Sequence, residues 1–306
     1  MKKEDIYSHC LERWNATDKR TSYFAENFDE WFSQLPEDIY EVVFQLLEMF
    51  EYYSQLKVNQ YLHDLGFKLD EKEQFNPEST IYTPLPSRKG IANSSYDYLF
   101  TYRQLHDISK YKIALDLDKY IEGKPDKYNE IQNIVIIDDY CGSGESLKAF
   151  IERHSKQLRG KTIYYLVTYF MEEAMPLIDE ISKQHEVAIE VIYINSGIRA
   201  FEYDVFSEKK DELRSLIKRR SKKLDIPSMY CFGKYKSESL VSFYNDTPNN
   251  TIGLFWCDSD KYFSIFPREF ENTEGLKRPT PRSLKQQKAA RTAQNYLSAM
   301  RKAQNE

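Results

Sequence analysis

The stretch "NIVIIDDYCGSGESLKAF", residues 133–150, decides the expected fold of this chain. A short apolar run ends in two aspartates, and a turn with two glycines leads into a segment with an apolar face. The run is typical of a buried parallel strand, and the segment after the turn is typical of a helix. This strand–turn–helix unit predicts an anion site, because N–H groups of the turn and of the helix start can bind phosphate.

The two acids beside this loop restrict the kind of phosphate ligand. A Walker loop would need a lysine that is absent here, and a dinucleotide loop would need glycine at Leu147. Carboxylates repel phosphate but accept hydrogen bonds from vicinal hydroxyls. The sequence therefore predicts a ribose 5-phosphate site, with the diol on Asp138 and Asp139. The predicted phosphate-binding residues are Cys141, Gly142, Ser143, Gly144, Glu145 and Ser146. The alternative is an ordinary turn at the end of a strand.

The residues around this unit predict a parallel α/β sheet flanked by helices. Strands are expected at 80–86, 162–170 and 187–195, and helices at 96–106 and 175–185 between them. The stretch "KYKIALDLDKY", residues 110–120, alternates like an exposed strand, and residues 122–130 have the composition of a turn-rich connection.

Composition along the chain predicts three parts. Residues 1–75 form an N-terminal helical segment, in which residues 35–66 are one long helix or two with a break, ending at Gly66. Residues 76–270 form the α/β domain with an aromatic-rich C-terminal hood, and residues 271–306 a basic tail that is helical or disordered.

Charge and cysteine content narrow the function classes. The net charge of −5 gives no global attraction to nucleic acid, but residues 209–223 and 277–306 each hold eight basic side chains. Such blocks are usually solvated helix faces, and the alternative is contact with nucleic acid or an acidic partner. The cysteines lack metal-site or disulfide spacing, and no segment predicts a leader or a membrane span, so a cytoplasmic protein without membrane contact is expected.

The "IVIIDDYCGSGES" motif resembles the ribose-phosphate signature of type I phosphoribosyltransferases. "PLPSRKG" lies where that family has its pyrophosphate loop, which implies pyrophosphate binding by Ser87, Arg88, Lys89 and Gly90. Residues 105–130 lie where the family has its flexible catalytic loop. With the late "PNNTIGLFWCDSDKYFSIFPR", the chain is similar over about residues 30–270 to phosphoribosyltransferase-like effectors of bacterial conflict systems, including those of retrons.

The resemblance implies a glycosyltransferase-type reaction: displacement or cleavage at ribose C1 of phosphoribosyl pyrophosphate or a nucleotide. Mg²⁺ would screen the charge of the pyrophosphate. Asp138 and Asp139 would be the catalytic pair and would interact with the metal only indirectly. Arg199 and Phe201 follow the last strand at the sheet's carboxyl edge, which favours contact with the base. The resemblance further implies a toxic anti-phage effector that meets a retron reverse transcriptase and its RNA or msDNA through the basic segments 209–223 and 277–306.

Two other functions stay open from the sequence. The same pocket could sense a nucleotide without catalysis, or the chain could be a nucleic-acid-binding partner, because one fold hosts several functions. A homo-oligomer is also compatible with the sequence, and the acceptor base has no recognisable signature.

Overall fold

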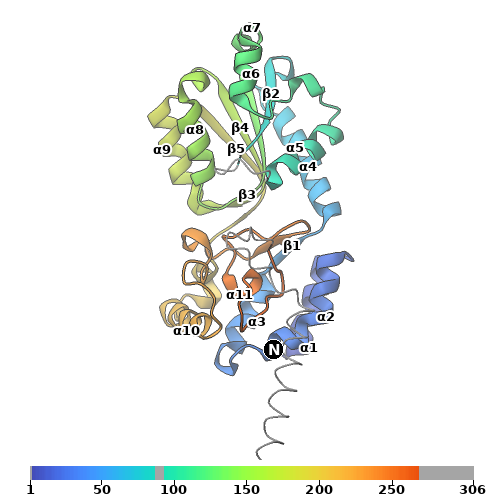
Figure 1. Ribbon diagram of the computed structural model, residues 1–306, viewed down its shortest axis with the longest axis vertical. Helices are drawn as coiled ribbons and strands as arrows, with labels where there is room; N and C mark the ends of the chain where they lie inside the picture. The colour runs from blue at the N-terminus through green and yellow to red at the C-terminus, as the bar shows by residue number, and fades with distance from the viewer. Residues whose placement is uncertain (1, 87–92, 269–306) are drawn as a thin grey trace, which may run out of the picture.

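The elements of the chain form two groups stacked along the long axis of the molecule (Figure 1). The structure is a computed structural model, and it describes residues 2–86 and 93–268. One group is built around a four-stranded sheet, and the other contains the N-terminal helices and the C-terminal part of the described chain. The sheet group is therefore inserted, in sequence, between the two halves of the second group.

All four strands of the main sheet are parallel, in the order β2-β3-β4-β5. The strands are β2 (Thr80–Pro84), β3 (Asn133–Cys141), β4 (Thr162–Met171) and β5 (Ala188–Gly197). Residue Cys141 pairs with Phe170, and Met171 pairs with Gly197, so the carboxyl ends of β3, β4 and β5 meet at one edge. The expected parallel α/β fold is confirmed.

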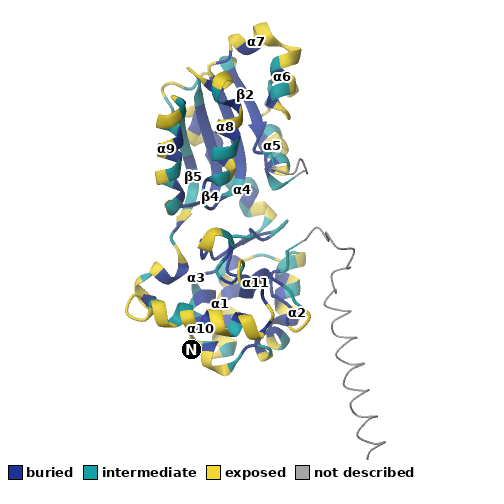
Figure 2. Cartoon of the chain, turned by 60° about the vertical axis from the view of Figure 1, so that its left-hand side comes forward, coloured by how far each residue is buried: buried dark blue, intermediate teal, exposed yellow. Residues whose placement is uncertain are grey.

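Helices cover both faces of this sheet, as a parallel sheet requires (Figures 1 and 2). Helices α4 (Gln55–Asp70) and α5 (Ser94–Leu105) cover one face, and α8 (Glu145–Leu158) and α9 (Met175–His185) cover the other. Side chains alternate along β3 accordingly: Ile134 and Ile136 pack with α8 and α9, whereas Val135 and Ile137 pack with α4 and α5. The apolar run thus fixes the position of the segment that follows it.

The second group has one hydrophobic cluster that joins the two ends of the described chain. Its elements are α1 (Lys3–Trp14), α2 (Lys19–Ser33), α3 (Tyr40–Met49), α10 (Lys210–Lys223), α11 (Gly253–Trp256), and the two parallel strands β1 (Glu51–Tyr53) and β6 (Val241–Phe243). The Trp31 indole donates to the Tyr262 hydroxyl at 2.5 Å, and the rings of Phe50 and Phe266 stack at 4.9 Å. The predicted boundaries at 75 and 270 stay a prediction about domains.

For residues 35–66 the structure confirms the alternative of two helices with a break, because β1 lies between α3 and α4. Three local expectations were wrong. Gly66 lies inside α4 rather than at its end. A Cβ added at Gly66 would lie 2.1 Å from the His106 ring. Instead of an exposed strand, residues 110–120 hold a 3₁₀ turn and the start of α6 (Leu117–Gly123), whose first turn is capped by Asp116. Residues 122–130 include the short helix α7 (Pro125–Asn129).

The remaining short elements are 3₁₀ turns. They span Glu37–Ile39, Pro77–Ser79, Lys110–Lys112, Glu172–Ala174, Ala200–Glu202, Asp204–Phe206 and Lys234–Lys236. Within the ranges 2–86 and 93–268, no helix combines the length and the apolar composition needed to cross a lipid bilayer.

Candidate functional site

The loop between β3 and α8 bends sharply because of its two glycines. Gly144 is the residue before the first turn of α8 and has φ +75°, a left-handed conformation that glycine adopts without strain. At Gly142 the reason is space, since an added Cβ would lie 2.6 Å from the Asn250 amide nitrogen. The loop thus leads directly into the start of a 14-residue helix, whose first N–H groups can bind an anion.

This loop lines a pocket of about 500 Å³ at the carboxyl edge of the sheet, where the two groups of elements meet. Besides the six residues 141–146, the sheet group contributes Leu85, Pro86, Asn93, Ser94, Asp138, Asp139, Tyr140, Leu147 and Tyr165. The second group contributes Lys234, Tyr235, Pro248, Asn249, Asn250 and Arg268. Both predicted acids and every predicted phosphate-binding residue therefore line one pocket.

Asp138 is the more deeply engaged of the two acids. It is 7% exposed, and its carboxylate accepts hydrogen bonds from the Tyr165 hydroxyl at 2.9 Å and from the Asp139 backbone N–H at 3.1 Å. Burial, and then the negative charge of Asp139, raise the pKa of Asp138 well above its usual range.

The pKa of Asp139 is raised as well, but its neighbours oppose part of the shift. Burial raises its pKa, but a hydrogen bond with the Ser94 side chain and the positive charge of Arg268 oppose that shift. Since the pKa of Asp138 is raised further than that of Asp139, we assign the first proton taken up by the pair to Asp138, and the protonated pair can both donate and accept hydrogen bonds.

Cys141 is not an activated thiol. Its side chain is buried, and burial followed by the charge of Asp138 raises its pKa to about 12. A thiolate is therefore disfavoured at neutral pH, and Cys141 fills space beneath the loop.

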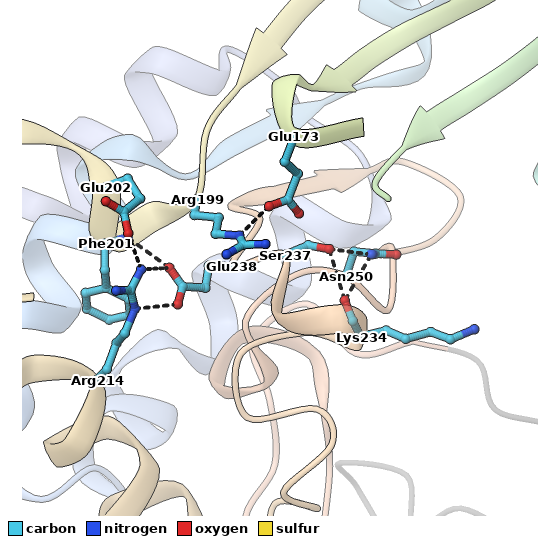
Figure 3. Close-up of polar contacts among 9 residues, drawn as sticks. All are labelled: Glu173, Arg199, Phe201, Glu202, Arg214, Lys234, Ser237, Glu238 and Asn250. Carbon is cyan, nitrogen blue, oxygen red and sulfur yellow. Dashed lines mark hydrogen bonds and ion pairs between the residues drawn. The ribbon is translucent and has the colours of Figure 1, made fainter. Parts of the chain in front are cut away.

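The predicted base contacts lie away from this pocket. The guanidinium of Arg199 is ion-paired with Glu173 (Figure 3). Phe201 is fully buried, its ring packs on Phe206 at 5.2 Å, and the Arg214 guanidinium lies 5.7 Å from its centroid. The structure does not bring Arg199 or Phe201 to the acid pair, because the chain turns into the second group directly after β5. The predicted pyrophosphate residues Ser87, Arg88, Lys89 and Gly90 lie outside the described residues.

Sequence reasoning missed the wall from the second group. Lys234 and Tyr235 carried no signal, because the loop that holds them has no motif. Asn249, Asn250 and Arg268 do belong to the quoted "PNNT" and "FPR" stretches, which had suggested a resemblance but no role.

Potential metal ligands are sparse in the described part of the chain. It contains no group of three or more His, Cys, Asp or Glu side chains that could hold a metal ion. The Asp138–Asp139 pair is thus compatible only with a metal held largely by a bound ligand and water.

The parallel sheet with an acid pair and a Gly-Ser loop at its carboxyl edge defines a phosphoribosyltransferase-like α/β protein. The chain belongs to the PRTase-CE family, whose model matches residues 28–268, and the resemblance to phosphoribosyltransferase-like effectors is confirmed. A hypothetical protein from Neisseria gonorrhoeae, solved with bound ppGpp, is similar at 10% identity over 55% of this chain and 98% of its own, with a TM-score of 0.32. Curated proteins give no significant match.

Proposed function

We propose that the pocket binds the ribose 5-phosphate unit of phosphoribosyl pyrophosphate or of a nucleotide, and that the chain transfers or cleaves at ribose C1. The observation that carries the proposal is the Asp138–Asp139 pair beside the Gly142–Ser146 loop within one pocket. Family membership supports the phosphoribosyltransferase-like class.

Each half of the ligand matches one part of this unit. Backbone N–H groups of the loop and of the start of α8 bind the 5′-phosphate, with the hydroxyls of Ser143 and Ser146 as further donors. The pair binds the 2′- and 3′-hydroxyls: Asp139 accepts a hydrogen bond, and Asp138 either accepts or, when protonated, donates one.

The reaction at C1 needs charge stabilisation more than proton transfer. The C1–oxygen bond breaks with its electron pair leaving on the pyrophosphate, and a nucleophile forms the new bond to C1. The negative charge on Asp139 stabilises the cationic ring that develops between these events, and the fixed loop orients it. Bound Mg²⁺ would neutralise the diphosphate, with Asp138 and Asp139 contacting it indirectly.

Pyrophosphate binding by residues 87–90 is part of the proposal. The described residues on either side of that segment, Pro86 and Asn93, both line the pocket. Arg88 and Lys89 would bind the departing pyrophosphate as charged donors.

The test is pyrophosphate release by the full chain with phosphoribosyl pyrophosphate, Mg²⁺ and a panel of bases and nucleotides. Asp138→Asn combined with Asp139→Asn should abolish release. The matched control is Asp126→Asn combined with Asp179→Asn, since both of these acids are exposed and lie on helices outside the pocket. Pyrophosphate release that survives the Asp138–Asp139 double change would refute the proposed chemistry.

We extend the proposal to a toxic effector in a retron-type anti-phage system, with support from the effector family. Expression of the wild-type chain should then slow growth of a bacterial host, and the Asp138–Asp139 double variant should not. Toxicity that persists in the double variant would separate the effector role from this pocket.

A nucleic-acid-binding role is a second candidate, supported by one face of α10. Lys218, Arg219, Lys222 and Lys223 are all exposed, and their spacing puts them on one side of the helix. Neutralising them to Gln should weaken RNA or single-stranded DNA binding and flatten its salt dependence, as should removal of 277–306. Unchanged salt dependence in both variants would rule out this role.

A further inference from the structure

The loop of residues 233–238 contributes two residues to the pocket that have no role in the proposed function. Lys234 and Tyr235 both line it, and the Tyr235 residue is 49% exposed. Neither side chain makes a hydrogen bond or ion pair within the described residues, and the Lys234 ammonium lies 5.0 Å from the centroid of the Tyr235 ring. They provide an aromatic surface and a cation, and the proposed binding of ribose 5-phosphate gives neither of them a role.

The backbone of this loop is strained. Tyr235, Lys236 and Glu238 have φ of 58°, 57° and 48°, in the left-handed region that residues with a side chain seldom adopt. Such conformations persist where the surroundings hold them, and they cluster at ligand sites.

Two polar clamps hold the strained loop in place (Figure 3). The first is at Glu238, which is 3% exposed: Arg214 on α10 donates to its carboxylate at 2.7 and 2.9 Å, and the Phe201 N–H donates at 3.2 Å. The carboxylate is thereby fixed from two directions, so that end of the loop cannot relax.

The second clamp is at Asn250. Its amide donates to the Lys234 carbonyl at 3.1 Å and to the Ser237 hydroxyl at 2.7 Å. These contacts bind the backbone of Lys234, while its side chain extends away from them (Figure 3). The backbone of the loop is therefore held rigidly, whereas the side chains of Lys234 and Tyr235 are available to bind a ligand.

The chemistry of these two side chains indicates what they bind. A Tyr ring offers a stacking surface to a planar heterocycle, and an ammonium without an ion pair attracts an anion. The other cation of this wall, Arg268, already shares its charge with Asp246 at 3.5 Å. Lys234 is thus the wall cation with no acidic partner among the described residues.

We infer that Lys234 and Tyr235 form the acceptor side of the pocket and select a planar ring that carries a negative charge. This inference rests on the proposed function, in which the loop and the acid pair bind ribose 5-phosphate. Arg214 and Glu238 act as positioning residues, because they hold the loop and do not line the pocket.

Calorimetric titration of the full chain with three probes tests this inference. Ribose 5-phosphate probes the phosphate and diol half alone. Nicotinic acid mononucleotide and nicotinamide mononucleotide add a ring, and they differ in a carboxylate against a carboxamide. We expect the carboxylate form to bind about tenfold more tightly, since a charged hydrogen bond adds that order of affinity.

Substitutions separate the two side chains. Tyr235→Ala should weaken both nucleotides about tenfold and leave ribose 5-phosphate unchanged, whereas Tyr235→Phe should retain binding. Lys234→Gln should abolish the preference for the carboxylate. If Tyr235→Ala leaves both nucleotides unaffected, or if the wild type shows no preference, the inference is wrong even though ribose 5-phosphate binds.

The positioning role has its own comparison. Glu238→Gln should weaken the nucleotides and their carboxylate preference without affecting ribose 5-phosphate. Glu202→Gln removes the exposed partner of Arg214 and should change neither the affinity for the nucleotides nor the preference for the carboxylate form. Equal effects of the two variants would overturn the positioning role. Failure of ribose 5-phosphate to bind, with Tyr235-dependent nucleotide binding retained, would instead refute the proposed ribose-phosphate site alone; failure of all three probes would refute both.

Discussion

Gly142 couples the phosphate loop to the wall of the second group, and Gly142→Ala should disturb both. The new Cβ would lie 2.6 Å from the Asn250 amide nitrogen and 2.8 Å from the Tyr140 ring, closer than van der Waals contact allows. Asn250 cannot move freely, because its amide donates to the Lys234 carbonyl and the Ser237 hydroxyl.

The size of the effect follows from these two hydrogen bonds. Each contributes about 1 kcal/mol net, so displacing Asn250 should cost about 2 kcal/mol of unfolding free energy. A loss of that size lowers the melting temperature of a 306-residue chain by roughly 3 °C. Ligand binding should weaken as well, because the loop that we propose to bind phosphate moves with Gly142.

Thermal denaturation and ribose 5-phosphate titration measure these two consequences. Gly123→Ala is the control: nothing lies within 4 Å of its new Cβ, so it should be neutral or slightly stabilising through the unfolded state. If Gly142→Ala melts at the same temperature as Gly123→Ala and binds ribose 5-phosphate like the wild type, the coupling between loop and wall is refuted.

Three further predictions concern the acids, the joined cluster and the buried thiol. The pKa of Asp138 is raised in the folded state, so its stabilising contribution is present at low pH and is lost as pH rises above about 4. Asp138→Asn should therefore gain stability relative to wild type between pH 4.5 and 7.5 in urea titrations; a constant difference would contradict the assigned proton. Trp31→Ala should lower the free energy of unfolding by about 3–5 kcal/mol and should speed thiol labelling of Cys257, which belongs to the same cluster, by a corresponding factor. Labelling of Cys257 that does not follow the loss of stability would show that the cluster does not unfold as a unit. Because burial raises the Cys141 pKa to about 12, iodoacetamide should leave Cys141 unmodified at pH 8 until the chain unfolds, and fast labelling would contradict its burial.

The strand–loop–helix unit at residues 133–150 could be predicted because its signals are local. The apolar run, the two acids and the two glycines act within a few residues of one another, and each restricts the backbone or the chemistry directly. The same holds for β2 and β4, which are buried on both faces, whereas most residues of β5 are only half-buried.

Local signals failed where a distant contact decided the outcome. Gly66 lies inside α4 and does not mark a helix end. A glycine is needed there because the His106 ring occupies the space that a side chain would fill. Phe201 follows a strand at the ligand edge, yet it is buried under Arg214, a residue that the sequence marked only as part of a basic helix.

The sequence by itself determined the strand–loop–helix unit that we propose as a ribose-phosphate site, since its residues are contiguous. Only the tertiary structure decided the opposite wall, where Lys234, Asn250 and Arg268 reach a pocket whose acids lie at Asp138 and Asp139. The physical reason is that the N-terminal helices and the C-terminal segment bury one shared cluster, and that packing brings the distant wall to the edge of the sheet.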